Sequence, residues 1–345
     1  MRYRLLGSSG LKVSELCLGT MTFGAVDTFG ADAETSAGVY AAFRDAGGNF
    51  IDTANIYAGG RSEQILARLI APERSRVVLA SKYSMSTDPQ ELNAGGNSRK
   101  NLRESLDATL RRLATDYLDL YWVHIWDGLT PLEETLRALD DAVRAGKVLY
   151  VGWSNAPAWV VARAQTLAEW HGWSRGVALQ LHYNLLERNV ERELLPCAAA
   201  LGMTVTAWSP LAGGLLTGKY RDAEGAQPAA RLTTTGWGRG LLTPRNFAIV
   251  ATLRQVAGRL GRTPAQVAIR WLLQRPGGVI PILGARDARQ LHELLAAREF
   301  ELDADALAEL DAASRIDLAY PYSLLRGIGQ KMVLGDRAPQ LLVRN

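Results

Sequence analysis

Cysteine and histidine are scarce in this sequence. Its 345 residues include two cysteines, Cys17 and Cys197, and four histidines. Two cysteines so far apart in the chain exclude a disulfide framework and fit a reducing compartment, so a cytoplasmic location is expected. Because the cysteines and histidines do not follow the spacing of zinc ligands, the sequence predicts no metal site.

Long apolar runs and a strong charge of either sign are also missing. No stretch approaches the roughly 18 consecutive apolar residues of a membrane-spanning helix, and the first residues lack the apolar core of a signal peptide. The balance of 39 Lys and Arg against 35 Asp and Glu leaves a net charge of +4. Such a mild charge predicts no nucleic-acid partner, although it is compatible with a small anionic ligand. Disorder is excluded, because 48% of the residues are hydrophobic and 21% are charged.

Short apolar segments alternate with longer amphipathic ones along the whole chain. At about 150 residues per domain the length suggests two domains, but a single α/β barrel also reaches this size. The eight candidate strands are apolar throughout, which is typical of strands buried on both faces of a parallel sheet. Eight strand–helix units favour one (β/α)8 TIM barrel, and hence a single domain over residues 1–345. The expected strands are residues 15–19, 49–52, 77–81, 117–124, 149–154, 177–182, 203–207 and 278–282.

Helical patterns fill the gaps between these strands. Gly47 is a plausible stop for the first helix, and Thr130 with Pro131 is a good N-cap and first-turn pair for another. The expected helices are residues 36–46, 62–70, 97–113, 131–145, 157–170, 190–201, 246–260, 264–274 and 287–296. Residues 3–5 and 11–13 predict a small hairpin that closes the barrel bottom. Residues 209–245, after the seventh strand, predict a long functional loop, and the tail after residue 311 is expected to be irregular.

Polar residues follow several of the expected strands, where barrel enzymes keep their catalytic groups. Asp52, Lys82 and His124 end the second, third and fourth strands, and Tyr57 lies in the loop after Asp52. A lysine ammonium favours the phenolate of a nearby tyrosine and so lowers its pKa, an aspartate holds the lysine charged, and a histidine can hydrogen-bond a carbonyl oxygen. Each residue alone is better explained as a cap, a solvated cation or a packing residue. Four together at one barrel mouth favour general acid catalysis of carbonyl reduction, with hydride from a cofactor.

Four segments that appear in order resemble motifs of the aldo-keto reductase superfamily. Residues 47–57 (GGNFIDTANIY) are similar to its G-x-N-x-[IF]-D-T-A-x-x-Y pattern, and residues 117–124 (YLDLYWVH) to Y-[IL]-D-L-x-x-x-H. Residues 146–155 (GKVLYVGWSN) are similar to G-K-[VI]-x-x-x-G-x-S-N, and residues 207–220 (AWSPLAGGLLTGKY) form the fourth motif. The resemblance spans nearly the whole chain. It is strongest to the bacterial aryl-alcohol-dehydrogenase-like branch and to the branch of potassium-channel β-subunits.

The resemblance implies an NADP(H)-dependent oxidoreductase in which Tyr57 donates the proton and His124 orients the carbonyl. Lys82 and Asp52 would adjust the pKa of Tyr57. The resemblance also implies that the cofactor lies across the barrel mouth without a Rossmann motif, and no G-x-G-x-x-G occurs in this sequence. Trp208 would stack on the nicotinamide ring. The other residues that it implies near the nicotinamide and the adjoining loop are Gly19, Thr20, Met21, Asp52, Ser154, Asn155, Gln180, Ser209, Pro210, Leu211, Gly213 and Leu215.

The phosphate end of the cofactor would meet a second group of residues. Residues 284–291 (GARDARQL) resemble the family's G-[AS]-x-x-x-x-Q-L at the start of the last barrel helix, where Arg286 favours NADP over NAD. Leu294 stands where relatives commonly have Asn, which removes an expected adenine hydrogen bond. The residues implied at this end are Lys219, Arg231, Gly284, Arg286, Gln290 and Glu293.

The expected substrate is an aldehyde or ketone of moderate size in an apolar, aromatic-lined cleft. The candidate pocket residues are Met21, Phe23, Ile56, Tyr57, Tyr83, His124 and Trp126. Two other functions stay open at this point. One is a slow-turnover, NADPH-binding regulatory subunit of the same fold. The other is a barrel hydrolase or lyase that uses Asp52 and further mouth carboxylates. The sequence leaves the oligomeric state undetermined.

Overall fold

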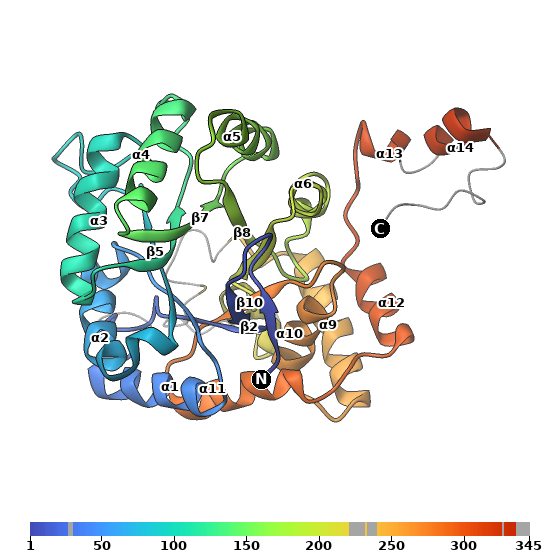
Figure 1. Cartoon of the computed structure of the whole chain (residues 1–345). Coiled ribbons are helices and arrows are strands. Elements are labelled where there is room, and N and C mark those ends of the chain that lie inside the picture. Colours follow the sequence, from blue (N-terminus) through green and yellow to red (C-terminus); the bar gives the residue numbers. More distant parts are fainter. Residues whose placement is uncertain (27–29, 221–231, 233–239, 326–327, 336–345) are drawn as a thin grey trace.

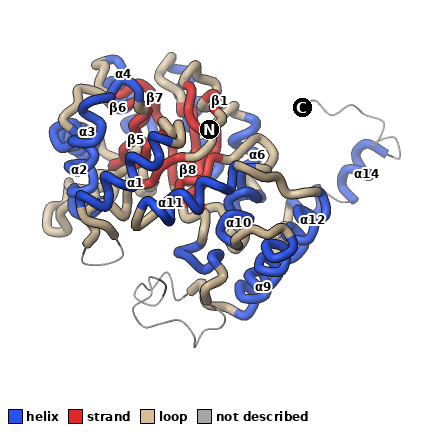
Figure 2. The backbone as a smooth tube through the Cα atoms, turned by 90° about the horizontal axis from the view of Figure 1, so that it is seen from below, coloured by secondary structure: helices blue, strands red, loops and turns tan. Residues whose placement is uncertain are grey.

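Eight parallel strands close into a barrel, in the chain order β3 to β10, with β10 paired back to β3. The structure is a computed structural model that describes residues 1–26, 30–220, 232, 240–325 and 328–335. The expected (β/α)8 fold is therefore confirmed, and Figure 2 shows the strands surrounded by helices. The barrel strands are β3 (Cys17–Gly19), β4 (Phe50–Asp52), β5 (Val78–Tyr83), β6 (Leu118–Val123), β7 (Val148–Ser154), β8 (Gly176–His182), β9 (Thr204–Trp208) and β10 (Ile280–Leu283).

The strands are apolar on both faces because both faces are covered. Every residue of β5 and β6 is buried. Side chains on one face, such as Phe50 and Trp122, fill the barrel interior, whereas those on the other, such as Leu79 and Tyr121, pack against the surrounding helices. Strand periodicity thus assigns alternate residues to two different hydrophobic cores.

Helices cover the outside of the barrel (Figure 1). Side chains cap several of them: Asp32 accepts from the Thr35 amide at the start of α1, and Thr263 and Gln266 form a capping box on α10. The helices of the barrel are α1 (Ala33–Asp45), α2 (Arg61–Ile70), α3 (Arg99–Leu113), α4 (Leu132–Arg144), α5 (Ala158–His171), α6 (Leu194–Ala200), α9 (Pro244–Arg259), α10 (Pro264–Leu273), α11 (Ala288–Leu295) and α12 (Ala304–Ala313). Short 3-10 turns are η1 (Tyr57–Gly60), η2 (Ala71–Arg76), η3 (Asn189–Glu191), η4 (Ala212–Thr217) and η5 (Ala296–Arg298).

The expected hairpin closes the end of the barrel where the strands begin. Strands β1 (Tyr3–Leu5) and β2 (Lys12–Ser14) pair antiparallel, one residue later in β2 than expected. Leu6 and Val13 are buried in the barrel-interior core, and the Gly7 amide donates to Thr204 Oγ1 at the start of β9. Figure 1 shows the hairpin lying across the barrel. The other end of the barrel is therefore the one left for ligands.

Some sequence-based predictions of helices were wrong. The segment 190–201 is not one helix, because η3 ends at Glu191 and α6 starts at Leu194. Thr130 does not cap α4: its hydroxyl bonds to Asp127 Oδ2 at 2.7 Å, which leaves Pro131 as an N-cap without a side-chain bond. Gly47 follows the end of α1 with a φ of +84°, as expected for a stop signal.

The tail after residue 311 contains more helix than expected. Helix α12 (Ala304–Ala313), which the sequence analysis did not predict, runs into this tail. Two short helices follow, α13 (Tyr322–Leu325) and α14 (Ile328–Leu334), which lie away from the barrel in Figure 1. Helix-forming residues in this tail lack a clear apolar period, so periodicity did not reveal them. The single-domain organisation of residues 1–345 stays a prediction. Within the described residues, no helix combines the length and the apolar character needed to cross a bilayer.

Candidate active site

A cavity of about 820 Å³ opens at the ends of the strands opposite the hairpin. Residues within or just after each of the eight barrel strands line it, so every strand contributes to one mouth. Of the four expected catalytic residues, Asp52, Tyr57 and His124 line this cavity. Lys82 lies directly beneath them with a fully buried side chain.

Lys82 connects the acidic and phenolic members of the site. Its ammonium donates to Tyr57 Oη at 3.0 Å, to the Thr53 carbonyl at 2.7 Å and to Asp52 Oδ2. An ammonium has three N–H donors, so all of them are used. Because Lys82 donates to the Tyr57 oxygen, the hydroxyl proton of Tyr57 points away from Lys82. It is thus placed for donation to a further acceptor.

Burial and the neighbouring charges together determine the protonation of Lys82 and Tyr57. Burial would lower the pKa of Lys82, but the charge of Asp52 and the contact with Tyr57 outweigh it and raise that pKa above its usual value. Burial likewise raises the pKa of Tyr57, against the opposing effect of Lys82. The expected net lowering of the Tyr57 pKa is therefore wrong for this structure, because desolvation of the phenolate exceeds the attraction of the ammonium. Tyr57 holds its proton at neutral pH.

His124 stands edge-on to the ring of Tyr57, with ring centroids 6.2 Å apart. Burial, assisted by the charge of Lys82, lowers its pKa to about 3, so the imidazole is neutral. Its Nδ1 is buried and has no hydrogen-bond partner in the part of the chain that the structure describes. A neutral imidazole next to a protonated phenol can direct a carbonyl oxygen toward that phenol.

Two amide side chains form the next part of the cavity wall. Gln180 Nε2 donates to Asp52 Oδ1 at 2.9 Å, so this carboxylate is bonded through both oxygens. Asn155 Nδ2 donates to the His124 carbonyl at 2.9 Å and to Ser154 Oγ at 3.0 Å. Asn155 Nδ2 thus uses both of its N–H donors within the protein, and Gln180 Nε2 uses one. The amide oxygens of Asn155 and Gln180 have no donor within the described ranges, which leaves two acceptors at the cavity.

Trp208 provides an aromatic surface at the end of β9. It lines the cavity, and it is followed by Ser209, whose φ of +53° is uncommon for a residue other than glycine. Asn155, after β7, has a φ of +48°. Strained backbone at two strand ends of one cavity is typical of sites where side-chain direction matters more than local stability.

A cationic region occupies the far part of the cavity. Lys219 and Arg286 both line it, together with Gln290 and Leu294. Burial lowers the pKa of Lys219, and the nearby charge of Arg286 lowers it further. Neither residue forms an ion pair with another described residue, so these two cations face the cavity without a protein counter-charge. Such an arrangement suits an anionic ligand.

The comparisons with known proteins agree with this geometry. Residues 15–315 match the model of the aldo/keto reductase family. This chain belongs to the aldo/keto reductase family. It is 37% identical over 327 residues to norsolorinic acid reductase of Emericella nidulans, which covers 92% of this chain and 82% of that protein. It is also 39% identical to an uncharacterized oxidoreductase of Bacillus subtilis, over 90% of this chain and 95% of that protein, and 34% identical to an aryl-alcohol dehydrogenase of Pestalotiopsis microspora, over 94% and 85%.

The chain is therefore an oxidoreductase, and most of its expected ligand-binding residues line one cavity. Beside those already described, the cavity is lined by Gly19, Met21, Ile56, Pro210, Leu211, Gly213 and Gly284. Arg231 lies outside the described residues. Thr20, Ser154 and Leu215 are buried behind the cavity wall, where Thr20 and Ser154 support Asp52 and Gln180 by hydrogen bonds to their carbonyls. Glu293 is exposed and does not line the cavity.

Three of the expected substrate residues do not line the described cavity of this aldo/keto reductase. Tyr83 follows the inward-pointing Lys82 on β5, so strand alternation turns it outward, where it stacks on Tyr121 at 5.2 Å. Phe23 is fully buried in the same outer core. Trp126 packs edge-on against Trp159, with centroids 5.4 Å apart. Proximity in sequence to catalytic residues was a poor guide here, because neighbouring side chains point to opposite faces.

The cavity also contains residues that the sequence analysis missed. Arg61, the first residue of α2, adds a third cation, and Met85 and Ile125 add apolar surface beside the catalytic group. The other additions are Thr22, Ala25, Ala58, Gly214, Thr217, Ile282, Leu283 and Ala285. Met85 and Ile125 directly follow strand ends, a signal that could have found them. Arg61 comes from a helix start, which has no comparable sequence signal.

Because folded His124 is neutral, the free energy of unfolding should fall as the pH is lowered. The folded pKa is about 3, whereas an unfolded histidine has the ordinary value of 6.5. Below pH 6.5 the unfolded chain takes up a proton that the folded chain does not, so each pH unit lost there removes up to about 1.4 kcal/mol from the free energy of unfolding. In urea titrations, the free energy of unfolding of the wild type should fall between pH 7 and pH 5. In His124→Asn this fall should be smaller by about 2 kcal/mol. His171→Asn, at an exposed histidine at the end of α5, is the control; equal slopes for His124→Asn and the wild type would contradict a neutral His124.

Proposed function

We propose that this aldo/keto reductase reduces aldehydes and ketones to alcohols reversibly, with NADPH as hydride source and Tyr57 as proton donor. The observation that carries the proposal is the triple donation of Lys82 to Asp52, Thr53 and Tyr57 at a cavity mouth. This arrangement leaves the Tyr57 proton free to move to a substrate oxygen. We further propose a single-domain enzyme in the cytoplasm.

The cavity suits a nicotinamide dinucleotide along its whole length. The acceptor oxygens of Asn155 and Gln180 match the N–H donors of a carboxamide, and Trp208 offers a flat face to an aromatic ring. The cations Lys219 and Arg286, which form no ion pair among the described residues, suit phosphate groups at the other end. When bound, this cofactor supplies hydride.

The protein's own part in the reaction is proton transfer. His124, neutral and edge-on to Tyr57, holds a carbonyl oxygen near the phenol. Tyr57 gives its proton to that oxygen as charge develops there, and the resulting phenolate lies 3.0 Å from the Lys82 ammonium. Asp52 balances the charge of Lys82 in both states. Burial keeps water away from Lys82, which strengthens its attraction for the phenolate.

The names of two relatives, norsolorinic acid reductase and aryl-alcohol dehydrogenase, support carbonyl–alcohol chemistry, the second of them on aryl alcohols. The experiment is the oxidation of NADPH, followed by its absorbance, with 4-nitrobenzaldehyde or methylglyoxal as substrate. Turnover is expected. Tight NADPH binding without turnover would favour a slow regulatory subunit instead, and failure of NADPH to quench tryptophan fluorescence would favour a hydrolase or lyase.

Arg286→Ala tests the preference for NADPH. Removing one charge-assisted phosphate contact should raise the KM for NADPH about 10- to 100-fold and the KM for NADH less than about 2-fold. Arg289→Ala, at an exposed arginine in the first turn of α11 that does not line the cavity, is the matched control and should change neither value. An equal loss for NADPH and NADH would show that Arg286 does not contact the 2′-phosphate.

A further inference from the structure

His182 stacks on the back of Trp208. The two rings are 4.2 Å apart and inclined by only 14°. Parallel pairing of β8 with β9 sets His182 directly opposite Trp208, one layer above the pair of Gln180 and Thr206. Trp208 also lines the cavity, so the imidazole on one side leaves the other indole surface available to a ligand.

Asn184 fixes the orientation of the imidazole. Its Oδ1 accepts from the amides of Leu186 and Glu187 at 2.8 and 3.1 Å, which identifies the other end of the side chain as the donor. That Nδ2 donates to His182 Nε2 at 3.3 Å and to the Ser209 carbonyl at 2.9 Å. Nε2 of His182 is therefore an acceptor, and the ring proton lies on Nδ1. One buried amide thus holds both His182 and the strained residue that follows Trp208.

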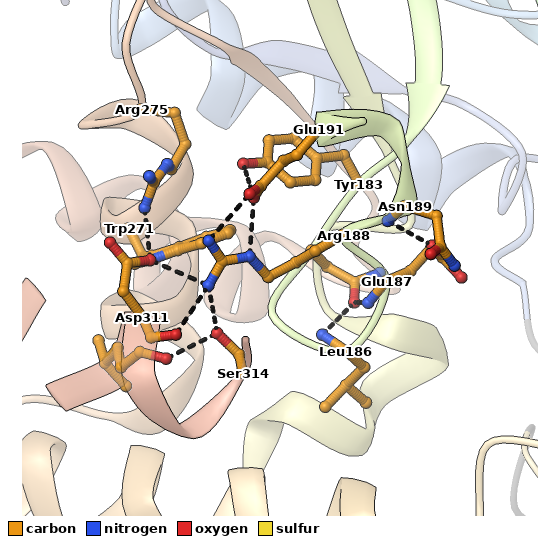
Figure 3. A network of polar contacts seen from close by, with 12 residues as sticks. Tyr183, Leu186, Glu187, Arg188, Asn189, Glu191, Trp271, Arg275, Asp311 and Ser314 are labelled. Carbon is orange, nitrogen blue, oxygen red and sulfur yellow. Dashed lines mark hydrogen bonds and ion pairs between the residues drawn. The ribbon is translucent and has the colours of Figure 1, made fainter. Parts of the chain in front are cut away.

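The loop that carries Asn184 is anchored to the C-terminal ends of α12 and α10. Figure 3 shows buried Arg188 between Glu191 and the end of α12, where its guanidinium donates to Glu191 Oε1 at 2.7 Å and to Ser314 Oγ at 2.7 Å. Arg188 also pairs with Asp311 at 3.0 Å, and Asp311 accepts from Arg275 at 2.7 Å. Tyr183, next to Asn184, donates to Glu191. A network of charged hydrogen bonds therefore restrains residues 183–191, and with them the position of Asn184.

We infer that His182 is a positioning residue that fixes the plane of the Trp208 indole, so that this ring presents a flat surface to the nicotinamide. The inference rests on the proposed function. A tryptophan at the end of a strand has rotamer freedom that a ligand would have to remove on binding. The stack on His182 removes it in advance, so cofactor binding loses less entropy. Asn184 and the Arg188 network act on Trp208 through His182 and Ser209.

The test compares His182→Ala with His182→Phe. The alanine variant removes the stack, whereas phenylalanine restores a flat ring without Nε2. The KM for NADPH should rise about 3- to 10-fold in His182→Ala, the loss expected for one aromatic contact, and return to within about 2-fold of wild type in His182→Phe. The Kd for 2′,5′-ADP, which lacks the nicotinamide, should stay unchanged in both. His171→Ala is the matched control, because His171 stacks on Trp173 at 4.3 Å at the end of α5, away from the cavity.

A second readout needs no cofactor. In protein labelled with 5-fluorotryptophan, the 19F signal that Trp208→Phe removes should shift and broaden in His182→Ala, and urea titration gives the stability of each variant. An unmoved Trp208 signal, or equal losses of NADPH and 2′,5′-ADP affinity, would overturn the inference. So would a His182→Phe variant as impaired as His182→Ala. If wild-type protein fails to bind NADPH, the proposed function itself fails, a result distinct from any difference among these variants.

Discussion

Tyr57→Phe should lower kcat for carbonyl reduction by about 100- to 10,000-fold, the range expected for loss of a general acid. The variant keeps the ring that contacts Lys82 and His124 but removes the only atom of Tyr57 that carries a transferable proton. NADPH affinity should stay within about 2-fold of wild type, because the residues proposed to contact the cofactor are untouched. The measurements are steady-state NADPH oxidation and quenching of tryptophan fluorescence.

Tyr320→Phe is the control for this experiment. Tyr320 lies in the C-terminal tail and is 83% exposed, so its hydroxyl should not affect turnover. Retention of more than about a tenth of wild-type kcat in Tyr57→Phe would contradict the role of proton donor. Loss of NADPH binding in the same variant would show instead that Tyr57 supports the structure of the site.

Lys82→Met should reduce both activity and stability. The Lys82 ammonium is fully buried and bonded to Asp52, so its removal leaves a carboxylate buried without a counter-charge. The expected cost is about 3–5 kcal/mol in the free energy of unfolding. The phenolate of Tyr57 would also lose its stabilising charge, so kcat should fall by at least about 100-fold. Urea titration and NADPH oxidation measure the two effects.

The double variant Asp52→Asn with Lys82→Met separates these effects. Removing both charges leaves no unpaired ion, so most of the lost stability should return, while the activity should not. Lys100→Met is the control, because Lys100 forms an exposed pair with Glu104 on α3 and should contribute less than about 1 kcal/mol. A stable but inactive double variant would support an electrostatic role for Lys82. A stability loss in Lys82→Met below about 1 kcal/mol would contradict the buried pair.

Periodicity located the elements of the barrel more reliably than their ends. All eight barrel strands lie where apolar runs were found, because a strand buried on both faces has a sequence signature of its own. The ends moved where side chains formed other bonds, as when Thr130 bonded to Asp127 instead of capping α4. Helix α12 was missed although Ala306 and Leu310 are buried in the outer core. The two short helices after Ala313 were also missed, since they contribute little to the barrel core and carry no clear apolar period.

The candidate site divides in the same way. Asp52, Lys82 and His124 could be found from the sequence because polar residues at the ends of apolar strands converge in a barrel. Tyr83 and Phe23 were misplaced, because a loop or strand neighbour of a catalytic residue can point to the outer core. Arg61 was missed because only folding brings the start of α2 to the cavity.

The sequence by itself determined the barrel, the family resemblance and the identity of the catalytic candidates, since these depend on local patterns and residue types. The tertiary structure decided the protonation of Tyr57 and His124, because burial is a property of the folded chain and here outweighs the charge of Lys82 on Tyr57. It also decided that His182 supports Trp208. His182 and Trp208 are 26 positions apart in the sequence and meet only because β8 and β9 pair in parallel register. Asn184, in the loop after β8, then fixes the orientation of the His182 ring.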